Sequence, residues 1–340
     1  MVGDNPQAVC VAVDAGSGDY APEAMVAGAL GALTRDPKLR VMLVGDARQL
    51  TQTLASHSES AACRPRLEQV SALSAVDEGG GAAWAVREAR NTASVSVTAQ
   101  LVKRGVADAG ISVGNTGAAL VAATLHLGLF PGIHRPVAGL VFPFAPNTCM
   151  LDMGPNVEVS ARHLLGFAQL GAAYVQAMLG ISRPSVGILS NGHESSKGTR
   201  QIREAYRLLA TSDLHFIGAL EAADLVAGVA HVVVTDGYVG NVVLKVVEAL
   251  AAWVRTRLSE AVSLVPIAAE TTETVLRDLD RLSDGTRFPS APMLLGVNGV
   301  FLLGHGRSQA MEVADLIERA AASVRNNVLA RLRAVEATWG

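Results

Sequence analysis

Cysteine is scarce in this sequence, and the three cysteines lie far apart. Cys10, Cys63 and Cys149 are odd in number, and none of them belongs to a CxxC motif. A disulfide framework or a zinc site needs paired or closely spaced cysteines. The cysteine pattern therefore argues against both and fits a reducing cytoplasm.

Aromatic and charged residues are also few. They make up 4% and 17% of the 340 residues, whereas apolar residues make up 50%. Small and aliphatic residues dominate the apolar fraction, which is typical of helices packed on a parallel sheet. The net charge is −3 and no long Lys/Arg cluster occurs, so DNA and RNA are not expected as partners. The length suits residues 1–340 as a single α/β domain of two coupled lobes.

Neither a signal peptide nor a membrane span is expected. The first residues lack a basic segment followed by an apolar one. Residues 109–133 carry no charge and are long enough to span a bilayer. Asn115, Thr116 and Pro131 interrupt that run, and we interpret it as strand, turn, helix and loop.

Short β-branched runs alternate with Ala/Leu-rich segments along most of the chain. The predicted strands are residues 9–14, 40–44, 107–113, 148–153, 185–189 and 231–235, with paired strands within 294–303. The predicted helices are residues 22–33, 117–129, 161–179, 201–209, 241–257 and 309–332. This alternation predicts a mostly parallel sheet with helices on both faces. Residues 255–287 fit the sheet least and predict a projecting helical hairpin.

Five polar, glycine-rich loops follow predicted strands. They are residues 16–19, 114–117, 152–156, 191–198 and 236–241. Ligands of open α/β sheets bind beyond the carboxyl ends of the strands, and a helix start offers free N–H groups to an anion. Any one loop is explained by the backbone needs of a turn. Five of them on one predicted edge favour a polar site of about the size of a phosphate.

Other short motifs are weaker. Residues 110–114 match the GxSxG pattern, but the turn follows Ser112, whereas a hydrolase nucleophile stands at its apex. The Walker A and GxGxxG patterns are absent, as is HExxH. We therefore expect no nucleotide cofactor and no metal.

The loop motifs, taken in order, resemble the phosphate acyltransferases of bacterial phospholipid synthesis, the PlsX family. The resemblance runs from about Val11 to about Arg319. Its main motifs are Val13-Asp14-Ala15, Gly18-Asp19, Ala21-Pro22-Glu23, Ala107-Asp108-Ala109, Gly114-Asn115-Thr116-Gly117-Ala118, Leu151-Asp152, Gly154, Asn156, Lys197-Gly198, Phe216-Ile217-Gly218, Asp236-Gly237, Gly240-Asn241-Val242, Ala291-Pro292, Leu294-Leu295-Gly296 and His305-Gly306.

The resemblance implies a Rossmann-related fold similar to the isocitrate dehydrogenase type, and a homodimer. It also implies an enzyme that converts an acyl-carrier protein thioester and inorganic phosphate to an acyl phosphate. Such a protein works in the cytoplasm, with peripheral contact to the membrane. Residues 255–287 would be the helical tip used in dimer or membrane contact.

The resemblance also implies the roles of the site residues. Phosphate is the nucleophile, so the site has to hold it near the thioester carbonyl and stabilise an oxyanion. We predict that Lys197 supplies the positive charge and that Asn241 donates a hydrogen bond; the alternatives are a solvated loop lysine and an ordinary N-cap. The other predicted phosphate- or substrate-binding residues are Asp14, Gly18, Asp19, Asn115, Thr116, Gly117, Asp152, Asn156, Asp236 and Gly240.

Several positions depart from the family pattern. Tyr20 replaces a histidine, residues 89–94 replace a basic stretch, and His193 replaces a glutamate. These changes suggest a specialised relative that serves a dedicated carrier protein in secondary metabolism. A phosphotransacetylase-like enzyme that uses acyl-CoA and a non-catalytic scaffold for carrier protein or membrane remain the alternatives.

Overall fold

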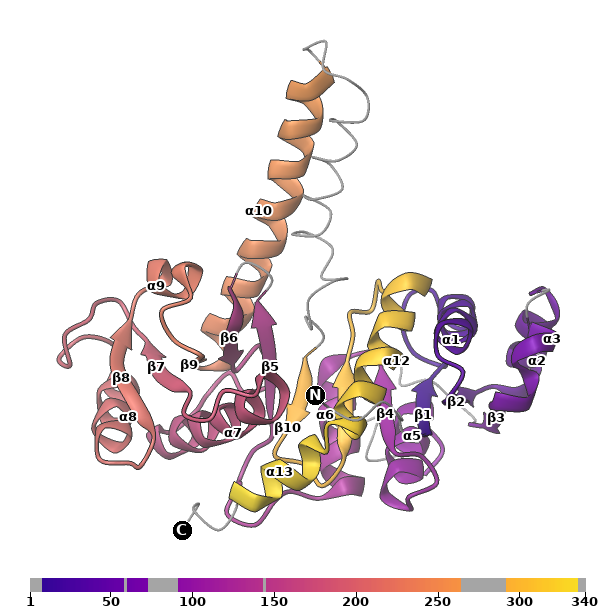
Figure 1. Ribbon diagram of the computed structural model, residues 1–340, viewed down its shortest axis with the longest axis horizontal. Helices are drawn as coiled ribbons and strands as arrows, with labels where there is room; N and C mark the ends of the chain where they lie inside the picture. The colour runs from indigo at the N-terminus through magenta and orange to yellow at the C-terminus, as the bar shows by residue number, and fades with distance from the viewer. Residues whose placement is uncertain (1–7, 58–59, 73–90, 143–144, 264–291, 336–340) are drawn as a thin grey trace. The chain divides into compact units, whose positions relative to one another are not determined.

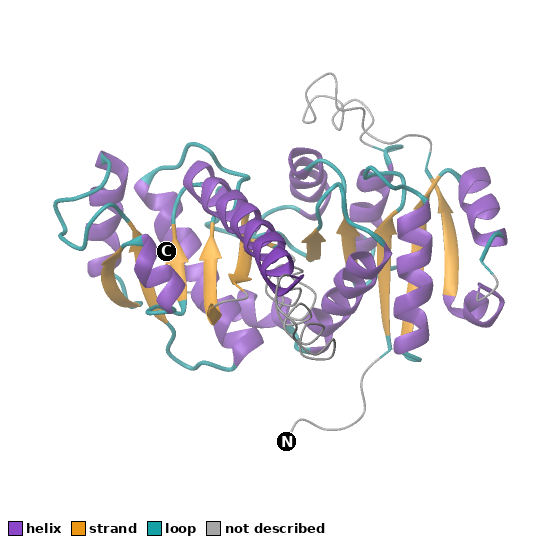
Figure 2. Ribbon diagram, turned by 90° about the horizontal axis from the view of Figure 1, so that it is seen from above, coloured by secondary structure: helices purple, strands orange, loops and turns teal. Residues whose placement is uncertain are grey.

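The computed structural model describes residues 8–57, 60–72, 91–142, 145–263 and 292–335 (Figures 1 and 2). The chain divides into two compact units. Unit 1 consists of Met1–Val137, Gln176–Ile181 and Ala291–Gly340, and unit 2 consists of Ala138–Val175 and Ser182–Ser290.

Unit 1 is built on a sheet whose strand order is β3-β2-β1-β4-β11-β10. Among the described pairings of this unit, β10 and β11 are antiparallel and the others are parallel. Its strands are β1 (Val9–Asp14), β2 (Leu39–Gly45), β3 (Leu67–Ser71), β4 (Ala109–Ser112), β10 (Met293–Leu295) and β11 (Val300–Leu303). Its helices are α1 (Glu23–Arg35), α2 (Ala47–Ala55), α3 (Ser60–Cys63), the 3₁₀ turn η1 (Arg64–Arg66), α5 (Ser94–Lys103), α6 (Thr116–Leu127), α12 (Ala310–Arg325) and α13 (Val328–Val335).

The central strand β1 is buried on both faces, and its side chains alternate between two helical layers. Cys10 and Ala12 pack with Leu101 of α5. On the other layer α1 and α12 approach each other closely. A methyl group at Gly28 would lie only 2.6 Å from Cβ of Val313, so glycine leaves the space that this approach needs. Two-sided burial explains the uninterrupted apolar run in β1.

Unit 2 has the strand order β5-β6-β9-β7-β8, in which β5 and β6 are antiparallel and the other described pairs are parallel. Its strands are β5 (Val137–Phe142), β6 (Ala145–Leu151), β7 (Ser185–Leu189), β8 (His215–Leu220) and β9 (Val232–Val234). Its helices are α7 (Ala161–Leu179), α8 (Arg200–Ala210), α9 (Ala222–Ala227) and α10 (Gly237–Ser263).

Helix α10 packs one side on the core of unit 2. Val239, Val243, Leu244 and Val247 lie against a buried cluster that includes Phe142 and Met150 of the sheet. Further along, α10 extends away from β6 and β9 (Figure 1). The first half of the helix is therefore anchored, while its outer side stays exposed.

Most of the predicted elements are present. The strands at residues 9–14 and 185–189 and the helix at 161–179 are confirmed with the same bounds, and the uncharged run 109–133 folds as β4, α6 and a loop. The single closing helix predicted at 309–332 was wrong, because α12 ends at Arg325 with Asn326 as its C-cap, and Asn327 adopts a positive φ of 52°. Of the predicted hairpin at 255–287, residues 264–287 lie outside the described part.

Candidate functional site

Three neighbouring strands of unit 1 end side by side. In the sheet register, Asp14 of β1 pairs with Ser112 of β4, and Ser112 pairs with Leu303 of β11. The loops that follow these strands therefore start at one edge of the sheet. This is the arrangement that the sequence predicted for the loops at residues 16–19 and 114–117.

Asp14 is a buried carboxylate and not an exposed anion contact. It is fully buried, and Ser112 Oγ donates a hydrogen bond of 2.7 Å to its Oδ2. Burial raises the pKa of Asp14, while the nearby hydroxyls of Ser94, Ser112 and Ser17 oppose this rise. The hydrogen bond joins the ends of β1 and β4. It also gives Ser112 a structural partner, which argues against a nucleophilic serine.

The loop after β1 is fixed to the loop after β11. The Asp19 N–H donates to the Gly306 carbonyl at 2.7 Å, and Gly18 has a φ of 100°, which favours glycine. The Asp19 carboxylate is exposed and lies 3.8 Å from Nε of Arg307. Tyr20 is 48% exposed.

Helix α6 begins at Thr116 with an ordinary N-cap. The Asn115 side chain accepts a hydrogen bond of 3.1 Å from Ala118 N. The first N–H groups of a helix, here those of Thr116 and Gly117, have no partner within the helix. Both residues are exposed, so this helix start can receive an anion.

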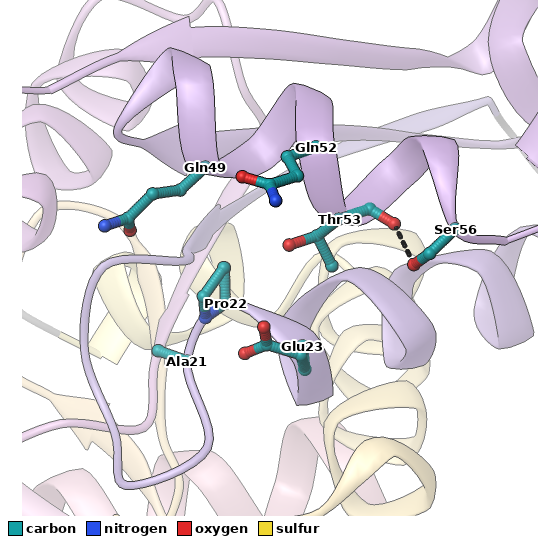
Figure 3. Close-up of a pocket in the computed structure, with 7 residues that line it drawn as sticks. All are labelled: Ala21, Pro22, Glu23, Gln49, Gln52, Thr53 and Ser56. Atoms are coloured by element: carbon teal, nitrogen blue, oxygen red, sulfur yellow. Dashed lines mark hydrogen bonds between the residues drawn. The ribbon is translucent and has the colours of Figure 1, made fainter.

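A pocket of about 450 Å³ in unit 1 lies next to these loops but is lined by different residues (Figure 3). Its lining consists of Ala21, Pro22, Glu23, Gln49, Gln52, Thr53 and Ser56. This lining holds one carboxylate and no cation, so it does not suit a phosphate. None of the predicted site residues belongs to it.

In unit 2, Asp152 is the centre of a second polar cluster. Its side chain accepts hydrogen bonds from Asn156 N at 2.8 Å, from Asn156 Nδ2 at 2.6 Å and from Gly154 N at 3.2 Å. Burial raises its pKa to about 6, although these donors oppose the rise. Asp152 and Asn156 are both buried, so they shape the loop after β6.

The start of α10 packs directly on that loop. Gly237 N donates to the Asn156 carbonyl at 2.8 Å, and a methyl group at Gly240 would overlap the Asp152 carbonyl. Asp236 caps the helix, since its Oδ1 accepts from Val239 N at 2.8 Å. The prediction that Asn241 stands at the helix start was therefore wrong. Asn241 lies in the second turn, exposed, with its side chain near Gly154.

Lys197 lies in the loop between β7 and α8. The loop is held by Gly198 N donating to Asn191 Oδ1 at 2.8 Å and by Lys197 N donating to the Glu194 carbonyl at 2.9 Å. Gly192 leaves room for the aliphatic stem of Lys197, because a methyl group there would lie 3.0 Å from its Cγ. Lys197 is exposed, so its ammonium group is accessible to an anionic reactant.

The parallel register brings the unit 2 residues to one edge. Leu151, Val234 and Ile188 are paired across β6, β9 and β7, so the loops of Asp152, Asp236 and Lys197 leave the sheet together. The twelve predicted residues thus form two sets of six. Unit 1 holds Asp14, Gly18, Asp19, Asn115, Thr116 and Gly117, and unit 2 holds Asp152, Asn156, Lys197, Asp236, Gly240 and Asn241.

Sequence reasoning missed one contributor to these clusters, Arg307, which approaches Asp19 from a distant loop. Of the altered stretch at residues 89–94, residues 89 and 90 lie outside the described part. Among the described residues, no group of three or more His, Cys, Asp and Glu side chains is placed to hold a metal ion.

Solved structures with the same fold include two enzymes of different chemistry. EutD phosphotransacetylase from Staphylococcus aureus matches with a TM-score of 0.55 and 16% identity over 94% of this chain and 96% of that chain. A Salmonella typhimurium protein described as a 4-hydroxythreonine-4-phosphate dehydrogenase matches with a TM-score of 0.51 and 14% identity over 93% and 99%. These likenesses confirm the predicted Rossmann-related α/β class and show the fold alone.

Sequence comparison is more specific. A phosphate acyltransferase from Pelotomaculum thermopropionicum is 39% identical over 95% of this chain and 94% of its own length. A phosphate acyltransferase from Thermobifida fusca is 41% identical over 89% of this chain and 84% of its own length. The family model described as a fatty acid synthesis protein matches residues 9–331. The chain belongs to this family, the PlsX phosphate acyltransferases.

Proposed function

We propose that this chain transfers an acyl group from the thioester of an acyl-carrier protein to inorganic phosphate. Acyl transfer to phosphate is the activity in the names of its full-length relatives, and this agreement over about 95% of the chain is the observation on which the proposal rests. The proposal that the acyl donor is a carrier protein is more specific. It rests on the resemblance of the loop motifs.

In the proposed reaction a phosphate oxygen attacks the thioester carbonyl carbon. The new C–O bond forms, the C–S bond breaks, and the thiolate leaves with the electron pair and takes a proton from solvent. Negative charge on phosphate and on the carbonyl oxygen has to be stabilised. A serine or cysteine nucleophile is not needed, which agrees with the buried positions of Ser112 and Cys149.

Lys197 is the proposed cation of the reaction. It is exposed on the loop edge of unit 2, where Asp152 and Asn156 fix the neighbouring loop and the start of α10. The first N–H groups of α10 already meet Asn156 and Asp236, so they offer less to an anion than Lys197 does. In unit 1, the N–H groups of Thr116 and Gly117 are the proposed anion donors.

The test is phosphate-dependent formation of acyl phosphate by the purified protein. Product is trapped with hydroxylamine, and release of the carrier thiol is followed, with acyl-carrier protein or acyl-CoA as the donor. We expect product with the carrier protein and a loss of about a hundredfold in kcat in Lys197→Ala. Lys245→Ala, which removes another exposed lysine of unit 2, is the control.

Three results would contradict the proposal in different ways. Turnover with acyl-CoA alone would move the donor to coenzyme A, as in the phosphotransacetylase-like alternative. Binding of the carrier protein without turnover, at several acyl chain lengths, would support the alternative of a non-catalytic scaffold. Full activity in Lys197→Ala would remove Lys197 from the site but not the reaction.

We also propose that the protein is a homodimer formed through α10. Val242, Val246, Leu250 and Trp253 are 44%, 58%, 56% and 57% exposed and recur every three or four residues, which places them along one side of the helix. The adjoining side of the helix packs on the core of unit 2. A contiguous apolar stripe of this kind marks an interaction surface.

The same helix bears on the proposed location, which is the cytoplasm with peripheral contact to the membrane. Among the described residues, Gly237–Ala261 is long and apolar enough to cross a membrane by length and composition.

Light scattering tests the proposed dimer. We expect Leu250→Glu to lower the measured mass from that of a dimer to that of a monomer, whereas Met311→Glu, at an exposed methionine of α12, leaves it unchanged. A dimer that persists in Leu250→Glu, together with lost flotation on phospholipid vesicles, would assign the stripe to the membrane.

A further inference from the structure

The loop that carries Lys197 is tied to a second element by one side-chain contact. His193 Nε2 lies 2.7 Å from Oδ2 of Asp224, which belongs to α9. Strands β7 and β8 are parallel neighbours, so the loop after β7 and the helix after β8 start at the same edge of unit 2. The contact therefore joins two segments that are 31 residues apart in the sequence.

Asp224 is a fixed anchor for this contact. Its Oδ2 also accepts a hydrogen bond of 2.8 Å from Glu221 N, within the capping box at the start of α9. The side chain is 22% exposed, whereas that of His193 is 61% exposed. A carboxylate that is already held by the backbone loses little further freedom when it binds an imidazole.

On the loop side, His193 lies within the turn that orients Lys197. Asn191 accepts from Gly198 N, which encloses His193, and the Glu194 carbonyl, one residue after His193, accepts from Lys197 N. Arg203 of α8 donates to the Gly198 carbonyl at 2.6 Å and holds the far end. Within the described residues of this turn, His193 makes the one ion pair that reaches outside the loop and α8.

We propose that His193 is a positioning residue whose contact with Asp224 holds the Lys197 loop in its reactive arrangement, and that protonation of the imidazole strengthens this contact. The inference rests on the proposed function of Lys197.

The charges around the imidazole are all negative. Asp224 and Glu221 face it from α9, and Glu194 lies on its own loop. The hydrogen bond and charge of Asp224 raise the pKa of His193, and the same contact lowers the pKa of Asp224, after the larger effect of the Glu221 N–H. The charge-assisted contact is therefore present below the raised pKa of His193. It weakens as pH rises through that value, when a neutral imidazole donor remains.

An exposed pair of this kind has a modest effect, equivalent to at most about a fivefold change in an equilibrium. The surface pair Arg257–Glu260 joins neighbouring turns of one helix. The His193–Asp224 pair differs because it limits the motion of a loop relative to a helix. Its effect should appear in the reactivity of Lys197 rather than in global stability.

The experiment combines a titration with kinetics on the full chain. Histidines labelled with ¹³C in the ring are titrated by NMR in the wild type, His193→Gln, Asp224→Asn and the control His215→Gln, which replaces another exposed histidine of unit 2. The His193→Gln spectrum assigns the resonance. We expect the pKa of His193 to lie above the ordinary range of a histidine, and Asp224→Asn to move it back toward that range.

The kinetic arm measures kcat/KM for phosphate from pH 6 to pH 9 with acyl-carrier protein as the donor. Phosphate itself titrates in this range, so the informative quantity is the ratio of wild type to His193→Gln. We expect this ratio to be about two to five below the pKa of His193 and to approach one above it. The ratio of wild type to His215→Gln should stay at one throughout.

Each outcome has one meaning. If His193 titrates in the ordinary range of a histidine and does not respond to Asp224→Asn, the contact does not exist in solution and the proposal fails. If the titration is as expected but the kinetic ratio is flat, the contact exists without positioning Lys197, which also refutes it. If the wild type makes no acyl phosphate, the proposed function fails, while the titration still decides whether the loop is tied to α9.

Discussion

Substitution of Asp152 by asparagine tests how the central carboxylate of unit 2 is stabilised. The pKa of Asp152 is raised from 3.8 to about 6, chiefly by burial. A group that binds its proton more tightly in the folded chain stabilises the fold fully below pH 3.8, and this contribution is lost as pH rises through 6. The difference between the two values corresponds to about 3 kcal/mol.

Asp152→Asn removes this pH dependence but not the side-chain shape. The amide oxygen still accepts from the neighbouring N–H groups, whereas its NH₂ group faces donors from Asn156 or Gly154. We therefore expect a less stable variant at pH 4. Relative to the wild type, its free energy of unfolding should rise by about 2 kcal/mol between pH 4 and pH 7, because pH 4 already lies slightly above the unfolded value of 3.8.

Hydrogen exchange of the β6 and β9 amides in urea reports the unfolding of unit 2 directly. Asp236→Asn is the matched control, since it alters a carboxylate on the same edge that caps α10. A constant difference between Asp152→Asn and the wild type over this pH range would refute the reasoning. So would a ¹³C titration that places the carboxyl pKa of Asp152 below 4.

Further substitutions test the packing of the clusters. Gly240→Ala should lower the free energy of unfolding by at least about 1–3 kcal/mol and reduce turnover, because its methyl group overlaps the Asp152 carbonyl. Gly31→Ala, whose methyl group would lie 3.7 Å from Ala314 Cβ, should instead stabilise helix α1 by about 0.5–1 kcal/mol in thermal unfolding. Equal melting temperatures for the two variants would contradict this. Ser112→Ala should lower stability by about 1–3 kcal/mol, because Asp14 loses its hydroxyl donor, and retain acyl phosphate formation at a permissive temperature. Abolished chemistry in a folded Ser112→Ala protein would instead support a serine nucleophile.

The sequence predicted elements best where local signals and burial agree. The strand Ser185–Leu189 and the helix Ala161–Leu179 have apolar patterns bounded by polar or turn residues, and both were found with the expected bounds. The break between α12 and α13 had no such signal. Asn326 and Asn327 are weaker signals for the end of a helix than Gly or Pro.

The start of α10 was misplaced because tertiary packing overrides propensity there. Gly237 and Gly240 suggested a loop, yet both lie in the helix, where their missing side chains let it approach Asn156 and Asp152. Asp236 caps the helix, but an Asp-Gly pair is also typical of a turn, so the sequence placed Asp236 in a loop. Burial of Asp14 and the pairing of His193 with Asp224 depend on strand register, which one sequence does not display.

The path of the chain through the two units has a consequence for biosynthesis. Unit 2 ends at Ser290, whereas the sheet of unit 1 still lacks β11, which pairs with β4 and comes from residues 300–303. On the ribosome, unit 2 therefore has its whole sequence before unit 1 does, although unit 1 contains the N-terminus. Until the last fifty residues emerge, β4 presents an unpaired parallel edge. A nascent chain stalled there, or a product truncated before β11, is open to aggregation through that edge.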